Sequence, residues 1–304
     1  MNAARSCHDV EMAKHPLTWH PVASVAAALA LALGGCSTQA PSMSAQSPQS
    51  AQLSPADSAS LDASIAGPQR ADKARARDVY RHPKETLAFF DVQPTQTVLE
   101  IAPGGGWYTD VLAPYLRGQG HLYEAQYVSR LPELAQEDRD TDAAFNRKIA
   151  GAPGVYGNLV VGTLHAGQFS GFDAQGRFDC VLTFRNIHNW LKDGQLDANL
   201  RAFHAALKPG GVLGVEEHRA RPGTSVQQMI DTGYVTQAYV IERVEAAGFV
   251  LDATSEINAN PRDTKNYPHG VWSLPPTYRG GDVDRARYAA IGESDRMTLR
   301  FVKR

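Results

Sequence analysis

The pattern of apolar and polar positions changes repeatedly along residues 72–303, and each change predicts a switch between strand and helix. Short apolar runs predict seven strands, at residues 97–101, 121–126, 158–164, 178–184, 212–216, 249–255 and 297–303. Between several of these runs, apolar residues recur every three or four positions, as at Leu196, Leu200, Phe203 and Leu207. This alternation predicts an α/β fold with a doubly wound, mostly parallel seven-stranded sheet, and the last two strands predict an antiparallel edge.

The first 35 residues follow a different pattern. Residues 22–33 form a run of Ala, Val and Leu with one Ser that is too short to cross a bilayer but matches the apolar part of a secretory signal. A Leu-Gly-Gly-Cys36 sequence follows at once and resembles the bacterial lipobox, whose cysteine is lipidated. We therefore expect a lipoprotein signal peptide over residues 1–35 and a membrane anchor through lipid on Cys36. The alternative is an apolar segment that ends in cysteine by chance.

Residues 36–70 are rich in Ser, Ala, Gln and Pro. Such a composition buries too little apolar surface to offset the entropy of ordering, so it predicts a disordered tether. Ser37, directly after the cysteine, resembles the pattern that sorts lipoproteins to the outer membrane, facing the periplasm. These features leave residues 71–304 for one folded domain held at the cell envelope.

The composition narrows the class of protein further. A hydrophobic fraction of 43% supports a sizeable core, and 20% charged residues suit a soluble surface. The net charge is −2 and the basic residues are scattered, which argues against a nucleic-acid partner. Cys7, Cys36 and Cys180 have no CxxC spacing, so we expect neither a disulfide framework nor a metal cluster built from them.

A glycine-rich loop follows the first predicted strand of the domain. The run Ala102-Pro-Gly104-Gly-Gly106 ends that strand, and the apolar spacing over residues 107–116 predicts a helix after it. Ligands of doubly wound folds lie at the carboxyl ends of strands, where glycine lets the backbone approach a ligand and adopt positive φ. A dinucleotide fingerprint needs a further glycine three residues after Gly106, but Thr109 stands there, which disfavours NAD.

Four motifs, taken in chain order, resemble those of class I S-adenosylmethionine-dependent methyltransferases. They are the loop at residues 100–106, the strands at 120–126 and 178–182, and the Leu-Lys-Pro-Gly-Gly-Val-Leu segment at 207–213. More narrowly, the Pro-Gly-Gly-Gly-Trp-Tyr-Thr loop and residues 185–190 resemble an uncharacterised bacterial branch of predicted methyltransferases. The resemblance spans the folded region and implies that S-adenosylmethionine is the cofactor.

The resemblance also implies a set of cofactor contacts, namely Glu100, Ala102, Gly104, Gly106, Glu124, Gln126, Thr163 and Arg185. This chain departs from the family at three of them. Ala102 stands where the family usually has glycine. Gln126 stands where the family has a carboxylate for the ribose, with Glu124 on the same face of the strand. The segment around Thr163 lacks the acidic residue that the family often places near the adenine, so the expected affinity is lower.

The segment at residues 185–190 follows the strand at 178–184, where an acceptor would meet the methyl group. Methyl transfer is an in-line displacement in which positioning dominates, so a base is needed only if the acceptor atom carries a proton. His188, together with Asn186, is the candidate for that catalytic role at neutral pH. The alternative is that both side chains bond to the loop backbone.

Predicted substrate contacts come from four places along the chain, at Tyr80, Trp190, His218 and Tyr267. Packing in the core is the alternative for Trp190. Residues 258–282 are rich in proline and aromatic residues, and we interpret them as a lid, with a packed surface loop as the alternative.

The sequence Glu216-Glu217-His218 raises the question of a metal site. No second histidine lies at helical ligand spacing, so we expect no metal.

The sequence therefore predicts an S-adenosylmethionine-dependent methyltransferase that acts on a small molecule. The alternative is a non-catalytic, ligand-binding envelope lipoprotein that has kept the fold. The lipobox favours this alternative, because S-adenosylmethionine is a cytosolic metabolite. An NAD-dependent oxidoreductase is the third hypothesis, and Thr109 together with the segment at 207–213 disfavours it.

Overall fold

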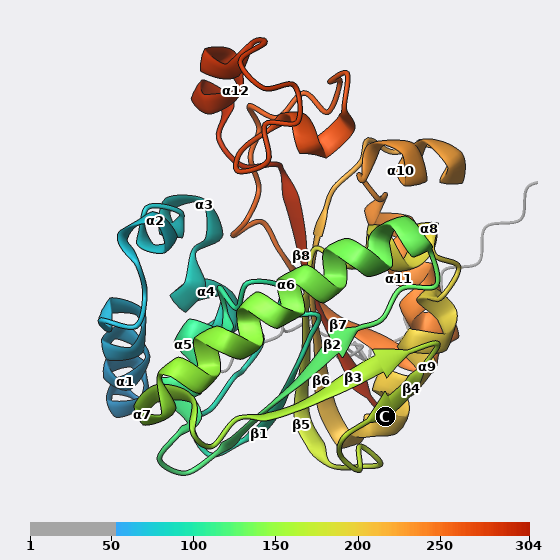
Figure 1. Cartoon of the computed structure of the whole chain (residues 1–304). Coiled ribbons are helices and arrows are strands. Elements are labelled where there is room, and N and C mark those ends of the chain that lie inside the picture. The colour runs from blue at the N-terminus through green and yellow to red at the C-terminus, as the bar shows by residue number, and fades with distance from the viewer. Residues whose placement is uncertain (1–52) are drawn as a thin grey trace, which may run out of the picture. The chain divides into compact units, whose positions relative to one another are not determined.

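A computed structural model describes residues 53–304 of the chain (Figure 1). The predicted signal peptide, the predicted lipidation site Cys36 and the first part of the predicted tether lie outside these residues. Within the described part, none of the helices has both the length and the apolar character needed to cross a membrane.

One eight-stranded sheet forms the centre of the described domain, with the strand order β4-β3-β2-β1-β5-β6-β8-β7. The strands are β1 (Thr97–Ile101), β2 (His121–Tyr127), β3 (Val160–His165), β4 (Gln168–Ser170), β5 (Phe178–Phe184), β6 (Leu207–His218), β7 (Phe249–Ser255) and β8 (Arg296–Lys303). The central strand β1 is parallel to both neighbours, with Leu99 opposite Tyr123 of β2 and Val181 of β5. The predicted α/β class and mostly parallel sheet are therefore confirmed.

The sheet differs from the prediction in strand number. The extra strand β4 pairs antiparallel with β3 after a turn in which Ala166 and Gly167 both have positive φ. Its three residues are too few to produce a recognisable apolar pattern. At the other side, β8 runs antiparallel between β6 and β7, so the last two strands form the predicted antiparallel edge, with β7 as the outermost strand.

Helices cover both faces of this sheet (Figure 1). In chain order, the helices of the described part are α1 (Pro55–Ala66), α2 (Asp72–Arg75), α3 (Asp78–Arg81), α4 (Pro83–Phe89), α5 (Thr109–Leu116), α6 (Pro132–Gly151), α7 (Pro153–Tyr156), α8 (Ile187–Lys192), α9 (Leu196–Ala206), α10 (Val226–Thr232), α11 (Gln237–Ala246) and α12 (Arg285–Ile291), with a 3₁₀ turn η1 (Gly270–Ser273); α10, η1 and α12 lie above the sheet rather than on its faces (Figure 1). Because successive strand residues point to opposite faces, Val98 packs in a core with Leu112 of α5, whereas Leu99 packs in another with Leu200 of α9.

Helix α1 shows that part of the predicted disordered tether is folded. Residues 55–66 of that segment are helical, and Ser54 caps the helix by accepting a hydrogen bond from the Asp57 amide. Leu61 is fully buried in the core that contains Leu112 of α5. Composition alone suggested disorder, because a single leucine does not reveal that a complementary surface on α5 will bury it.

Residues 257–294 form a separate layer above the carboxyl ends of the central strands (Figure 1). Tyr267, Val271, Leu274 and Tyr288 pack around Tyr234 in a small core of their own. This layer closes one side of the space that the parallel strands leave at their carboxyl ends.

Candidate functional site

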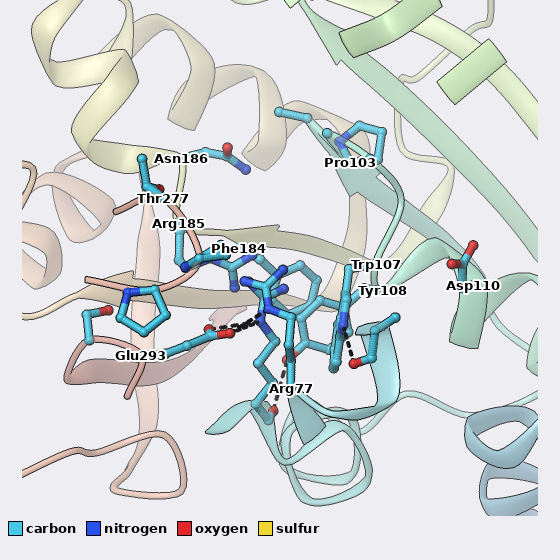
Figure 2. Close-up of a pocket in the computed structure, with 18 of the residues that line it drawn as sticks. Arg77, Pro103, Trp107, Tyr108, Asp110, Phe184, Arg185, Asn186, Thr277 and Glu293 are labelled. Carbon is cyan, nitrogen blue, oxygen red and sulfur yellow. Dashed lines mark hydrogen bonds and ion pairs between the residues drawn. The ribbon is translucent and has the colours of Figure 1, made fainter. Parts of the chain in front are cut away.

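A cavity of about 890 Å³ lies at the carboxyl ends of β1 and β5 (Figure 2). Its walls come from the amino-terminal helices, the glycine-rich loop, the loop after β5 and the layer at residues 257–294; they include Arg77, Arg81, Glu100, Gly104, Trp107, Arg185, Asn186, His188, His218, Trp272, Pro276 and Glu293. This volume is typical of sites that enclose small molecules.

The glycine-rich loop presents an open backbone surface to this cavity. A Cβ atom added to Gly104 or Gly105 would meet nothing within 4 Å, and Gly104 has a φ of +56°. Ala102 also has positive φ, 51°, which explains why glycine is the usual residue at its position. Gly106 has another role, because its Cβ would lie 2.8 Å from the ring of Phe145 on α6. The predicted cofactor residue Gly106 is therefore required for helix packing.

Two buried glutamates lie side by side behind the loop. Glu100 on β1 is in register with Glu124 on β2, and it accepts a hydrogen bond of 2.8 Å from the Thr109 hydroxyl. Burial raises the pKa of Glu100 to about 7. Burial and the neighbouring Glu100 raise the pKa of Glu124 well above its usual range. Burial therefore favours the protonated form of Glu124, and its two oxygens have no hydrogen-bond partner among the described residues.

Helix α6 covers the side of the sheet to which the resemblance assigns the adenosine. Gln126 at the end of β2 is buried, and its Nε2 donates to Oδ1 of Asn146 on α6 at 3.0 Å. Thr163 lies opposite Gln126 in the β2–β3 register. Lys148 of α6 donates to the carbonyl oxygen of Gly105 at 3.0 Å, which ties the helix to the loop. Glu124, Gln126 and Thr163 thus lie outside the cavity, unlike Glu100, Ala102, Gly104 and Arg185.

The loop after β5 begins with a residue in a strained conformation. Arg185 has a φ of 62°, and its Nη1 atom donates to Oε1 of Glu216 on β6 at 2.9 Å. The side-chain amide of Asn186 donates to the carbonyl oxygen of Ile101 at 3.1 Å and to the Thr183 hydroxyl at 3.2 Å. Asn186 therefore ties the ends of β1 and β5 together, and its oxygen is the atom left for a ligand.

His188 is held by a buried carboxylate. Its Nδ1 lies 3.0 Å from Oε1 of Glu217, and Glu217 also accepts the backbone N–H groups of His188 and His218 at 3.2 and 2.7 Å. An ionised carboxylate only accepts hydrogen bonds, so the imidazole donates to Glu217 through Nδ1–H, and in the neutral ring Nε2 is then the proton acceptor. Glu217 is fully buried, whereas His188 lines the cavity.

His218 lies beside the His188–Glu217 pair, but its imidazole is next to a hydroxyl group rather than a carboxylate. Its Nδ1 is 2.6 Å from the Ser294 hydroxyl, and its ring centre is 5.2 Å from that of His188. Burial, followed by the nearby His188 and Arg185, lowers the pKa of His218 well below its usual value, so its ring is neutral.

The structure also brings His188, Glu217 and His218 together as a group that could supply metal ligands. Their ligand atoms lie within 4.8 Å of one another. A search of the sequence for two ligands at helical spacing misses this group, because its three residues come from two different elements, α8 and β6. Two features oppose a cation there: the carboxylate oxygens already accept N–H groups, and the guanidinium of Arg185 lies nearby.

Three of the four predicted substrate contacts lie outside the cavity. Trp190 is fully buried between Tyr127 and Phe203, which agrees with the alternative that it packs in the core. Tyr267 packs on Tyr288, and the ring of Tyr80 lies against Gly292. His218 is the predicted substrate contact that does line the cavity.

Sequence reasoning missed the residues that line the cavity from distant parts of the chain. Arg77 and Arg81 come from the amino-terminal helices, with Arg81 over the ring of Trp107, and Glu293 and Trp272 come from the layer at residues 257–294. Figure 2 shows Glu293 directed toward Arg77, with a bond of 2.6 Å between Oε1 and Nε. No local pattern marks these residues, since Arg77 and Glu293 are 216 positions apart.

Comparisons with known proteins agree with this fold and place the chain in a family. A family model described as a methyltransferase domain matches residues 71–253. A crystal structure of an S-adenosylmethionine-dependent methyltransferase from Aquifex aeolicus is 14% identical, with a TM-score of 0.50 and coverage of 83% of this chain and 99% of that one. The [4+2]-cyclase SpnF is 17% identical, with a TM-score of 0.51 and coverage of 81% and 93%.

No curated protein matches the chain. At these identities the structural likeness shows the fold alone, and a methyltransferase and a cyclase share it. The family match covers most of the described domain and includes the glycine-rich loop and the residues after β5. The predicted methyltransferase family is therefore confirmed. The chain belongs to the methyltransferase-domain family.

Proposed function

We propose that this protein transfers a methyl group from S-adenosylmethionine to an oxygen or nitrogen atom of a small molecule, and that His188 removes the proton from that atom. The observation that carries the proposal is the pair of His188 and Glu217 on a cavity that also contains the open glycine-rich loop. The cavity volume of about 890 Å³ supports a small acceptor.

The residues of the loop fit the amino-acid end of the cofactor. The space beside Gly104 and Gly105 is open, so their backbone is available to a ligand, and Glu100 lies behind them. When bound, S-adenosylmethionine supplies a methyl group on a positively charged sulfur. Gln126 is held by Asn146, so α6 has to release it before it can meet the adenosine part of the cofactor.

The His188–Glu217 pair supplies what a protonated acceptor needs. The unprotonated Nε2 accepts a proton from a hydroxyl or an amine, and the charged imidazolium that forms is stabilised by the carboxylate. Glu217 also holds the ring in one orientation, because it bonds both Nδ1 and the backbone N–H of the same residue. Glu217 is thus a positioning residue that acts through His188.

The test is a calorimetric titration of S-adenosylmethionine and S-adenosylhomocysteine into the full-length protein, followed by transfer of labelled methyl to a panel of phenols, catechols and amines. We expect micromolar binding, and we expect His188→Asn to keep this binding while it loses transfer. His121→Asn, which changes an exposed histidine on β2, is the matched control. Absence of binding at millimolar cofactor would refute the proposal.

The second candidate function is a ligand-binding envelope protein without catalysis. It is favoured by the bond between Gln126 and Asn146, which occupies a side chain that the resemblance assigns to the cofactor. This second candidate predicts that the folded protein does not bind S-adenosylmethionine in the titration above.

We also propose that Cys36 carries a lipid that anchors the protein to the outer membrane, facing the periplasm. The Leu-Gly-Gly-Cys sequence after an apolar run supports this proposal. Labelled fatty acid should enter the wild-type protein in cells and should not enter Cys36→Ser. Equal labelling of both proteins, or of neither, would contradict it.

A further inference from the structure

A largely buried cluster of charged groups lies at one wall of the cavity. Arg77, Arg81 and Arg296 all contact the carboxylate of Glu293, through nitrogen–oxygen distances of 2.6, 3.0 and 3.2 Å. Arg296 also contacts Glu216, at 3.1 Å, and Arg185 contacts the same Glu216 oxygen, at 2.9 Å. These four arginines and two glutamates form the arginine cluster.

The arginine cluster carries more positive than negative charge. Its four guanidinium groups meet two carboxylates, which leaves an excess of two positive charges, and both glutamates are almost fully buried. The other acidic residues that line the cavity do not offset this excess. Asp110 forms an ion pair with Lys148, and the pKa of Glu100 is raised to about 7 by burial. Excess charge away from water is costly unless a counter-ion meets it.

The titration behaviour of the cluster is consistent with this excess. Burial, followed by the charge of Arg185, lowers the pKa of Arg81 to about 9. Burial by itself would raise the pKa of Glu293, but Arg81, Arg296 and Arg77 outweigh it and lower the value to about 2. The low pKa of Glu293 reports the positive charge of its three arginine neighbours, whereas Glu216 and Glu293 raise the pKa of Arg185 against the effect of burial.

The cluster also has donors that the described protein does not use. Nη2 of Arg77 is buried and has no hydrogen-bond partner among the described residues. Arg81 bonds to Glu293 through Nε alone, and its guanidinium lies 4.8 Å from the centre of the Trp107 ring. Arg77, Arg81 and Arg185 line the cavity, and the Nη atoms of Arg81, which bond to none of the described residues, are the donors placed to meet a ligand. Nη2 of Arg77 is covered, so it reaches a ligand only when the Arg77 side chain turns. Guanidinium groups bind carboxylate and phosphate well, because their planar donors match paired oxygens.

We propose that the acceptor substrate carries a carboxylate or phosphate group, and that Arg77, Arg81 and Arg185 bind this group in the cavity. The inference rests on the proposed function, since it concerns the acceptor of the same site. The rings of Trp107 and Trp272, which also line the cavity, suit an acceptor with an apolar body. S-adenosylmethionine itself carries a carboxylate, and the experiment distinguishes that source from the acceptor.

Inorganic phosphate is the probe. It is titrated into the full-length protein against sodium chloride at constant ionic strength, by calorimetry and by thermal unfolding, with and without saturating S-adenosylhomocysteine. We expect phosphate to bind with a Kd in the low millimolar range under both conditions. Arg77→Met should weaken phosphate binding about tenfold, because it removes one charged donor. Arg75→Met is the matched control, since Arg75 carries the same charge on α2 but does not line the cavity.

A second variant keeps the test informative if Arg77→Met does not fold. Glu293→Gln removes a negative charge from the cluster and should tighten phosphate binding several-fold, which a merely structural role of Glu293 would not do. The proposal is overturned if wild-type protein does not bind phosphate, or if both arginine variants weaken binding equally. It is also overturned if S-adenosylhomocysteine abolishes phosphate binding, because the cluster then serves the cofactor.

The same titrations separate this inference from the proposed function. Phosphate binding without any S-adenosylhomocysteine binding would refute the cofactor and leave the anion site standing. S-adenosylhomocysteine binding without phosphate binding would refute the anion site and leave the cofactor standing.

Discussion

Replacement of Gly104 by leucine tests whether the glycine-rich loop meets the cofactor. Gly104 lines the cavity with a φ of +56°, and a Cβ there would have no neighbour within 4 Å, so the new side chain begins in open space. Gly176 provides a matched control, because it has the same φ of +56°, is exposed, and would also have no neighbour around its Cβ. Gly104→Leu and Gly176→Leu therefore impose the same backbone strain at different places.

The size of each effect follows from this geometry. Left-handed backbone costs a residue with a Cβ about 1–2 kcal/mol, so both variants should lose that amount of unfolding free energy. For a domain of this length, the melting temperature should fall by roughly 2–8 °C in both. Gly104→Leu alone fills space that the cofactor needs. We expect its Kd for S-adenosylhomocysteine to rise at least about 100-fold, which corresponds to about 2.7 kcal/mol.

Thermal unfolding by circular dichroism measures the strain, and calorimetric titration measures the binding. The expected result is two variants with equal stability, of which Gly176→Leu alone binds S-adenosylhomocysteine like the wild type. If Gly104→Leu binds as tightly as the wild type, the loop does not contact the cofactor and the placement of the site is wrong. Loss of binding in both variants would show that strain rather than obstruction is the cause.

Four further predictions concern the neighbours of this loop. Glu217→Gln should lower the rate of methyl transfer about 100-fold or more with unchanged cofactor affinity, because an amide does not fix the Nδ1–H tautomer of His188; an unchanged rate would remove His188 from the mechanism. Asn146→Ala should tighten S-adenosylhomocysteine binding about three- to tenfold by releasing Gln126, as calorimetry can measure, and weaker binding would refute a covering role for α6. The pKa values of Glu100 and Glu124 in the folded state lie above the usual 4.5, so the native state binds more protons than the unfolded state. The free energy of unfolding should therefore fall as the pH rises from 4.5 through about 7. Urea unfolding should show a smaller fall for Glu124→Gln than for the wild type. Chelation should leave methyl transfer unchanged, because the oxygens of Glu217 already accept N–H groups, and loss of activity that zinc restores would assign a metal to His188, Glu217 and His218.

Strand positions can be predicted from the sequence because they depend on local pattern. The apolar runs around Val98 and Val181 identify β1 and β5, and the carboxyl ends of neighbouring parallel strands meet at one edge of a sheet. That rule places the loop with Gly104 and the segment with His188 at the same edge, and both residues line the cavity.

The partner of His188 follows from the same rule, although the sequence pattern did not identify it. Glu217 comes directly after Glu216, which lies opposite Phe184 in the β5–β6 register, so the ends of these strands place the carboxylate next to the loop after β5. The sequence Glu216-Glu217-His218 is the available signal. Two carboxylates beside a histidine can be metal ligands, or one of them can orient a histidine on the neighbouring element. Without the strand register, the sequence does not distinguish these two roles.

The sequence by itself determined the α/β class, the mostly parallel sheet, the glycine-rich loop and the position of His188, because each follows from spacing within about ten residues or from a family motif. Tertiary structure alone decided that α1 is ordered, that Trp190 packs in the core, that α6 covers Gln126, and that Arg77 and Arg81 meet Glu293. These outcomes depend on which surfaces meet after the chain folds. Contacts between residues more than 200 positions apart leave no trace in local periodicity, so the charge that surrounds a ligand is settled only when the elements pack.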